Sequence, residues 1–476
     1  MYSEYSEVCC IKQISILTPA EALPHDNSFE IMKIIVTTIS TLSFLTSLHA
    51  QDSLQLSLRK AIEFGLANNK NIQAGALEAT LTGYTINEYR AGLYPVVNGN
   101  AGVTHYVDVP TQYARANTFD PTAASDKYTG FKLLLPNSAN AGLSADWLLY
   151  DQAVYSAIRL AKESSRLTDI QYQKDKSDLA FIISDLYYGI IFARKQQESL
   201  LKVDSNTSTL VEILQVQFDN GLIKRSDLDR VKVNKLSIGS RIDQLNSAIT
   251  TQVNLLKLLL GLYETTRIKL TEPDIDQLLV PVTEVADPGN NFDVRLIQEQ
   301  ITISKLQRKT IVAGYFPSLS ANYNYSYNWV STDFSKVFRS DLKFPQQYIG
   351  LNLSVPIFDG NRKLYKTREN TLATKQLELK AGFLLDKTNT DIRNAILGYN
   401  TSLRNVDANS SNVNLGEKLY AESLYEYQQG TISLNDVITT ENTLQQALNE
   451  YFGSVSTAFA TLLEYRKATN TILTTK

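Results

Sequence analysis

The chain has 476 residues, of which 43% are hydrophobic and 20% are charged, so it is apolar enough to build a folded core. Its formal net charge is -3. A nucleic-acid-binding surface needs clustered basic residues to neutralise phosphates, and no run of lysine or arginine appears in this sequence. The composition therefore excludes a disordered chain and argues against a nucleic-acid partner.

The stretch that follows Met32 is typical of a secretory signal peptide. One lysine precedes an apolar run, and a small-x-small cleavage pattern ends at Ala50. We predict a signal peptide over residues 32–50. Residues 1–31 are acidic and polar, unlike the start of a signal peptide, which indicates a non-native upstream extension. A genuine leader is the alternative interpretation.

Cysteine and histidine are scarce, which limits the chemistry available. Cys9, Cys10 and His25 lie upstream of the signal peptide and His49 lies within it, so the predicted mature chain keeps no cysteine and one histidine, His105. This excludes disulfides, thiolate metal sites and thiol nucleophiles. No Gly-rich phosphate loop, metal-spaced histidine pair or Gly-x-Ser-x-Gly motif appears. We therefore predict a protein that is not an enzyme and that needs no cofactor, with His105 at an interface.

The sequence repeats one plan twice. "NNKNIQAGALEATLTGYTINEYRAGLYPVV" from Asn68 aligns with "NNFDVRLIQEQITISKLQRKTIVAGYFPSL" from Asn290, and both segments end in Ala-Gly-x-x-Pro. "FDNGLIKRSDL" from Phe218 is similar to "YQQGTISLNDV" from Tyr427. We predict a first repeat at 51–265, a linker at 266–289, a second repeat at 290–466 and a C-terminal tail at 467–476.

Four segments alternate between apolar and polar residues. The clearest is "LSANYNYSYNW" from Leu319, with its aromatic residues on one side and its serines and asparagines on the other. We predict strands at about 95–109, 142–150, 317–330 and 348–357. Strands of about 10 residues with one apolar face are typical of membrane barrels, although a half-buried strand of a soluble sheet gives the same pattern.

Long helices are predicted after each strand pair. Residues 151–217 and 361–427 contain no proline, and at 1.5 Å per residue each helix could reach about 100 Å. Shorter helices follow, with apolar seams from Leu228 and from Val437 that step by three and four residues. We expect the long and the shorter helices to pack together with coiled-coil contacts. The alternative interpretation is that they form an ordinary coiled coil exposed to solvent.

Four strands cannot close a membrane barrel, because their edges would lie unpaired in lipid. Two copies would supply eight strands, which leave an interior filled by side chains, and three copies would supply twelve and a wet lumen. The small polar residues on the inward face favour three copies.

The duplicated plan resembles the TolC family of outer-membrane efflux proteins. The resemblance runs from "LSLRKAIEFGLANNKNIQAG" near the predicted mature start to the final heptads. It implies an α+β membrane protein with internal structural duplication. The resemblance further implies a homotrimer whose twelve-stranded transmembrane β-barrel, with four strands per chain, is continuous with a long periplasmic α-helical barrel of coiled-coil helices. The segment 266–289 would belong to a belt around that helical barrel.

The resemblance also implies a function. Family members are exit ducts in the outer membrane of Gram-negative bacteria and extend into the periplasm. They serve tripartite efflux or type I secretion, together with a periplasmic adaptor (membrane fusion) protein and an inner-membrane resistance-nodulation-division or ABC pump. A trimeric barrel-anchored structural protein or adhesin without transport is the alternative. The sequence leaves the cargo open.

The resemblance further implies a gate at the periplasmic helix-turn-helix tips. Asp227 and Tyr427 match an aspartate and a tyrosine that bond to each other in the closed state, and Asp436 matches a pore-facing aspartate. Threefold symmetry would bring three Asp436 carboxylates together as a cation-selective constriction. The tip turns expected to contact the adaptor contain Gly221, Leu222, Gly430 and Thr431.

This sequence departs from the family pattern in two places. Ile432 replaces a gate arginine, so the lock is weaker or uses Lys224 or Arg225, and Thr439 replaces a second ring aspartate. Helix capping, by Ser226 or Asp227 in one hairpin and by Asn435 or Asp436 in the other, is the alternative role of these side chains. Pro95 and Pro317 are predicted hinges between helix and strand.

Overall fold

The computed structural model describes residues 54–118, 121–122, 124–272, 280–282 and 286–473. The predicted upstream extension and signal peptide therefore lie outside the described residues. The same is true of part of the predicted linker and of the last three residues of the predicted tail.

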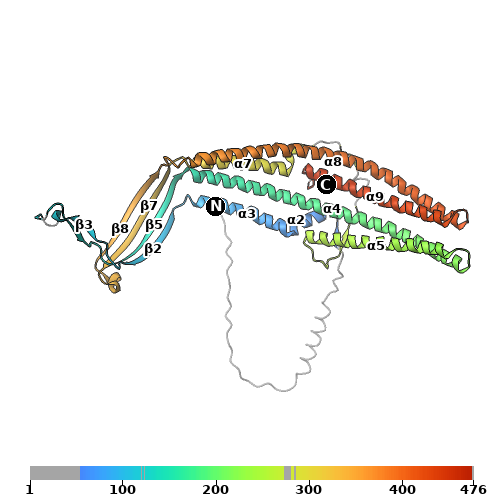
Figure 1. Ribbon diagram of the computed structural model, residues 1–476, viewed down its shortest axis with the longest axis horizontal. Helices are drawn as coiled ribbons and strands as arrows, with labels where there is room; N and C mark the ends of the chain where they lie inside the picture. The colour runs from blue at the N-terminus through green and yellow to red at the C-terminus, as the bar shows by residue number, and fades with distance from the viewer. Residues whose placement is uncertain (1–53, 119–120, 123, 273–279, 283–285, 474–476) are drawn as a thin grey trace, which may run out of the picture. The chain divides into compact units, whose positions relative to one another are not determined.

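The described chain is mostly helical. In chain order the helices are α2 (Leu58–Asn68), α3 (Lys70–Ala91), α4 (Gln152–Asp219), α5 (Arg225–Leu260), α7 (Phe292–Ala313), α8 (Arg362–Gln428) and α9 (Leu434–Ala468). The helices α4 and α5 form one hairpin, and α8 and α9 form a second (Figure 1). Among the described residues, no helix is both long and apolar enough to cross a membrane.

The two hairpins have nearly the same dimensions. The helices α4 and α8 have 68 and 67 residues, and α5 and α9 have 36 and 35. The predicted long helices end within two residues of the observed bounds, because no proline or glycine pair interrupts these segments. Each hairpin closes through one glycine turn.

Four strands form one antiparallel sheet in the order β2-β5-β7-β8 (Figure 1). They are β2 (Val96–His105), β5 (Asn137–Asp151), β7 (Ser318–Ser331) and β8 (Lys343–Ser354). They correspond to the four alternating segments of the sequence, although β5 and β8 begin about five residues earlier than the alternation suggested. The strands β2 and β8 are the edges of this sheet.

The register places apolar side chains on one face of the sheet. Val97 pairs with Ala145, Ala145 with Tyr323, and Tyr323 with Ile349. Directly paired residues share a face, so this row crosses all four strands on one side. The next row, of Asn98, Ser144, Asn324 and Tyr348, occupies the opposite face. The alternation in sequence is thus kept in space.

The apolar face of the sheet is open in one chain. Exposed apolar side chains come from each of the four strands, among them Val97, Leu143, Trp147, Tyr323, Tyr325, Ile349, Leu351 and Leu353. A soluble sheet would cover such a face with helices or a second sheet. The exposed face therefore needs another apolar surface or an apolar medium.

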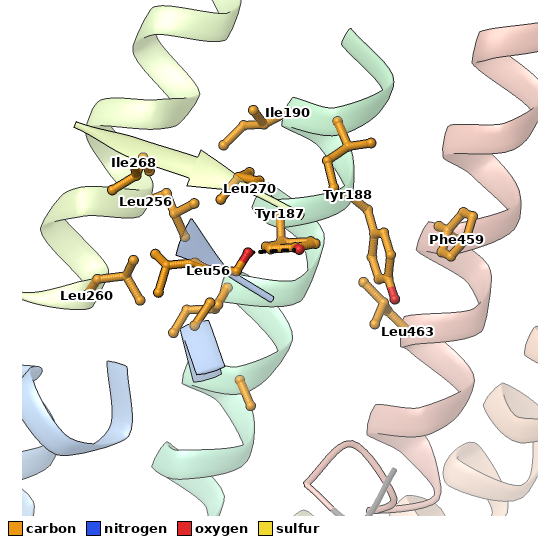
Figure 2. Close-up of a cluster of buried hydrophobic side chains, with 14 of the residues drawn as sticks. Leu56, Tyr187, Tyr188, Ile190, Leu256, Leu260, Ile268, Leu270, Phe459 and Leu463 are labelled. Atoms are coloured by element: carbon orange, nitrogen blue, oxygen red, sulfur yellow. Dashed lines mark hydrogen bonds between the residues drawn. The ribbon is translucent and has the colours of Figure 1, made fainter. Parts of the chain in front are cut away.

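A parallel strand pair that the sequence did not predict joins the beginning and the middle of the chain. The strand β1 (Leu54–Leu56) pairs with β6 (Ile268–Leu270), which falls inside the predicted linker. Both strands pack on α4, where the Tyr187 hydroxyl donates to the Leu56 carbonyl at 3.1 Å (Figure 2). The surrounding cluster also includes Phe459 of α9, so it connects both hairpins.

The segments that connect paired strands of the sheet contain further short elements. The short strands β3 (Gln112–Arg115) and β4 (Tyr128–Phe131) form a hairpin between β2 and β5. A six-residue 3-10 helix (Phe334–Arg339) lies between β7 and β8, and its buried Val337 holds it against the sheet. The ring N–H at His105 Nδ1 donates to Asn137 Oδ1 at 2.6 Å, and the two residues are paired at the ends of β2 and β5.

Candidate functional site

The candidate site consists of the two hairpin tips. Each long helix ends in a Schellman motif, in which a residue in left-handed conformation reverses the chain. Gly221 and Gly430 both have φ of 73°. The backbone N–H of Leu222 donates to Gln217, and that of Thr431 donates to Glu426. The two tips therefore share one backbone design, which requires glycine at both positions.

The second helices of the hairpins begin differently. Ser433 is the N-cap of α9 and forms a reciprocal capping box with Asp436, whose Oδ2 accepts from the Ser433 N–H at 3.0 Å and from its hydroxyl at 2.7 Å. Bonds from Ser433 hold the pKa of Asp436 below its ordinary value. The alternative capping role is thus observed for Asp436, with Ser433 rather than Asn435 at the N-cap.

The first hairpin lacks a side-chain cap. Lys224 occupies the N-cap of α5, so neither Ser226 nor Asp227 stands at that position, and the expected cap there is wrong. Asp227 lies in the first turn of α5, where a carboxylate interacts favourably with the helix dipole. Arg225 pairs with Asp229 on its own helix at 3.5 Å.

Tyr427 and Asp227 lie near each other, although they do not share a hydrogen bond. The Tyr427 hydroxyl of α8 donates to Gln217 Oε1 of α4 at 3.2 Å. Burial, with a smaller contribution from the Asp227 charge, raises the pKa of Tyr427. Gln217 is therefore a residue that the sequence did not single out, and it links the two hairpins directly above the tips.

Apolar contacts replace the arginine expected at position 432. Ile432 packs against a buried cluster between the hairpins, and Ile223 does the same from the other tip. The cluster is formed by side chains of α4, α5, α8 and α9, including Leu214, Leu228, Val231, Tyr420 and Val437. The tips are therefore held by apolar packing and by neutral hydrogen bonds.

Polar bonds continue between the hairpins along α9. Arg241 of α5 donates to Gln445 at 3.1 Å, and Gln196 of α4 donates to Asn449 at 2.9 Å. Glu441 is fully buried on the same side of α9 and contacts both α4 and α5. At the extreme tip, Leu222 is 74% exposed, and Thr431 is also exposed. An apolar side chain in that position is available for contact with another protein.

Pro95 and Pro317 stand where helix changes to strand. Pro95 lies between the end of α3 and Val96, and Pro317 lies between the end of α7 and Ser318. In both places, backbone bonds of the last helical turn close before the proline, for example from Tyr94 to Ala91 and from Phe316 to Ala313. A proline then prevents the helix from continuing.

Comparisons with solved structures reveal the fold. The chain matches the CusC structure, described in terms of transmembrane channel formation, with a TM-score of 0.70 and 15% identity over 89% of this chain and 95% of that one. It matches the CmeC outer membrane channel of Campylobacter jejuni (TM-score 0.67, 16% identity, 87% and 85% covered). It also matches the outer membrane protein VceC of Vibrio cholerae, with a TM-score of 0.66 and 15% identity over 87% of this chain and 95% of that one.

The chain therefore has the fold of outer-membrane channel proteins, as the sequence resemblance predicted. No family model matches the chain, and no curated protein matches it. At 15 to 16% identity these structural matches define the fold alone. Function must be argued from the sheet and the tips.

Proposed function

We propose that this chain is one subunit of a homotrimeric outer-membrane channel, gated at its hairpin tips, that exports substrates from a Gram-negative cell. The fold match supports a channel, and the open sheet supports membrane insertion. The observation that carries the proposal is the face of the sheet that exposes apolar residues from each strand. Among the described residues, the outer edges of β2 and β8 also have no partner strand.

The unpaired edges require other subunits. An exposed backbone N–H or C=O in lipid costs several kcal/mol, so β2 and β8 must each find a partner strand. If β8 of one chain pairs with β2 of the next, three chains close a barrel of twelve strands. The row of Asn98, Ser144 and Asn324 would then face a wet lumen, for which a barrel of eight strands is too narrow.

The hairpins would form the periplasmic part of the channel. Their equal lengths and shared tip motif support an origin by internal duplication, with each chain contributing two similar hairpins to a helical barrel. In a trimer three copies of Asp436 would meet around the axis and select cations. In each chain the bonds from Ser433 lower the pKa of Asp436 and so favour its ionised form.

The partners follow from the same proposal. A duct through the outer membrane needs a pump at the inner membrane, of the resistance-nodulation-division or ABC type, and an adaptor between them. The exposed tip residues Leu222 and Thr431, beside Gly221 and Gly430, are the surface we assign to the adaptor. Asp227, Tyr427 and Asp436 remain the proposed gate residues, with Gln217 as the partner of Tyr427.

Conductance across a planar bilayer tests the proposal. The purified protein, reconstituted from detergent, is expected to give discrete conductance steps that favour cations. A protein that forms stable particles in detergent but never conducts would instead support the barrel-anchored structural protein. Asp436→Asn separates the claim of conduction from the claim of cation selectivity, because this variant should keep the conductance steps and weaken the preference for cations.

A further inference from the structure

A buried carboxyl group lies between the two hairpins, about two turns into α9. Glu441 has 0% of its surface exposed and occupies a seam position between Val437 and Leu444, both of which are buried. The seam faces apolar residues of α4 and α5. Such a position usually holds an aliphatic side chain, so an ionisable group there calls for a specific role.

The carboxyl group bonds to both helices of the opposite hairpin. Glu441 Oε1 is hydrogen-bonded to Thr207 Oγ1 of α4, and Oε2 accepts from Asn234 Nδ2 of α5 at 2.9 Å. The Gln445 amide, one turn further along α9, also faces the carboxyl, although its Nε2 does not reach hydrogen-bonding geometry. Glu441 thus ties α9 to the hairpin formed by α4 and α5.

Whether Thr207 can form both of its hydrogen bonds at once depends on the protonation state of Glu441. Thr207 Oγ1 is within 2.9 Å of the Val203 carbonyl as well as bonded to Glu441. A hydroxyl group carries one hydrogen, so it can donate to only one of these oxygens at a time. Both bonds exist together when Glu441 is protonated and donates to Thr207, which then donates to Val203. An ionised carboxylate would compete with Val203 for that hydrogen.

No basic group offsets a charge on Glu441 within the described part of the chain. From α4 and α5 it faces Thr207 and Asn234, and from α8 it faces the Tyr420 phenol. Arg241 reaches Gln445 instead. Burial raises the pKa of Glu441, and the hydrogen bonds only partly oppose this effect.

The α8 side of the carboxyl offers a route for water. The Tyr420 hydroxyl is buried and has no hydrogen-bond partner among the described residues. Tyr420 also lines a cavity of about 310 Å³ together with Lys202 and Glu417. If the hairpins separated, water could reach Glu441 through this cavity and hydrate its charge. Tyr420 itself stays neutral, because burial and the nearby Glu441 raise its pKa.

We propose that Glu441 is a positioning residue of the gate, and that its protonated form holds the hairpin of α4 and α5 against the hairpin of α8 and α9. This inference rests on the proposed gated channel. A neutral carboxyl satisfies Thr207 and Val203 together, whereas an ionised one places an uncompensated charge in an apolar seam. Ionisation therefore favours separation of the hairpins, which hydrates the charge.

The sign of the pH dependence follows from linkage. The packed hairpins bind the proton of Glu441 more tightly than separated, hydrated hairpins, where its pKa is ordinary. The packed arrangement is therefore most favoured below the ordinary pKa and loses stability as the pH rises through the raised value. Within that window, each pH unit changes the ratio of packed to separated hairpins by at most about tenfold per chain.

Single-channel recording at a series of pH values from about 5 to about 8 tests the inference, because the series starts above the ordinary pKa of a glutamate and extends in the direction in which burial shifts the pKa of Glu441. Wild type is expected to show an open probability that rises with pH. Glu441→Gln keeps the size and hydrogen-bonding capacity but cannot ionise, so its open probability should stay low and flat. The control is Glu450→Gln, an exposed glutamate of the same helix, which should follow wild type. Equal profiles for wild type and Glu441→Gln would overturn the inference.

A distance measurement decides the question independently of conduction. Spin labels at Leu222→Cys and Thr431→Cys report the separation of the two tips, in trimers diluted with unlabelled chain. A longer distance should appear as the pH rises in wild type and be absent in Glu441→Gln. Absence of conductance in every variant would reject the channel, but the distance measurement would remain informative. Identical distance distributions in wild type and Glu441→Gln would reject the role of Glu441.

Discussion

Replacing Tyr427 with phenylalanine removes the hydrogen bond between the hairpins directly above the tips. The Tyr427 hydroxyl donates to Gln217 Oε1 at 3.2 Å in a partly buried setting, and its ring packs against the buried cluster between the hairpins. Phenylalanine keeps the ring packing, so the variant deletes one neutral hydrogen bond. Such a bond contributes about 1 kcal/mol, which changes the ratio of closed to open hairpins about fivefold per chain.

In a trimer the effect would accumulate. Three equivalent bonds give about 3 kcal/mol if they are independent, or roughly a hundredfold in the closed-to-open ratio. We expect Tyr427→Phe to raise the open probability in single-channel recordings without reducing trimer yield. The control is Tyr425→Phe, because Tyr425 is 63% exposed on the same helix and should behave as wild type.

A double mutant tests whether Gln217 is the partner. Gln217→Leu should raise the open probability to a similar extent, and the combination with Tyr427→Phe should add little, because both changes delete the same bond. Additive effects, or an unchanged open probability in Tyr427→Phe, would refute the reasoning. If Asp227→Ala alone opened the channel, Asp227 rather than Gln217 would be the partner of Tyr427 during gating.

Two further predictions concern the tips. Gly221→Ala should destabilise the first tip by about 1 to 2 kcal/mol, because the φ of 73° at this position is unfavourable for an L side chain, and faster hydrogen exchange would measure the loss. The control is Gly382→Ala within α8, where no neighbour is close, and it should be neutral or stabilising. Equal behaviour of the two variants would contradict the assignment. Ser433→Ala should cost about 1 kcal/mol in the first turn of α9. Because Ser433 lowers the pKa of Asp436, the stabilisation by the wild-type cap is present above the ordinary carboxyl pKa and is lost as the pH falls through the lowered value. Unchanged hydrogen exchange in Ser433→Ala would argue against the cap.

Periodic segments were predictable from the sequence because their pattern repeats many times. The seams of α5 and α9 step by three and four residues over most of each helix, and the four strands of the main sheet alternate over about ten residues each. The tip glycines were predictable for a different reason, since only glycine adopts left-handed conformation without strain. In these cases a local rule determines the structure.

Short or nonlocal features could not be predicted. The strands β1 and β6 have three residues each, too few for any period, and they pair across more than two hundred positions. Gln217 bonds to Tyr427 from a helix that is 210 residues distant, and nothing in either local sequence indicates the contact. Glu441 interrupts an apolar seam of α9, and its partners Thr207 and Asn234 come from two other helices.

The helix starts at the tips show how one local rule can mislead. Ser226 and Asp227 are good N-cap residues, yet Lys224 holds that position, because the Schellman turn and the packing of Ile223 fix where the chain enters α5. In the second hairpin the equivalent turn places Ser433 at the N-cap, and Asp436 supports it from the third helical position. Tertiary packing therefore decided between neighbouring candidates.

The mass of the native particle tests the central claim most directly. The account requires that the edges of the sheet, β2 and β8, pair between chains and that its apolar face contact lipid or detergent. Native mass spectrometry of protein released from detergent should therefore give three chains per particle. A monodisperse single chain that stays folded in detergent-free buffer would contradict the account.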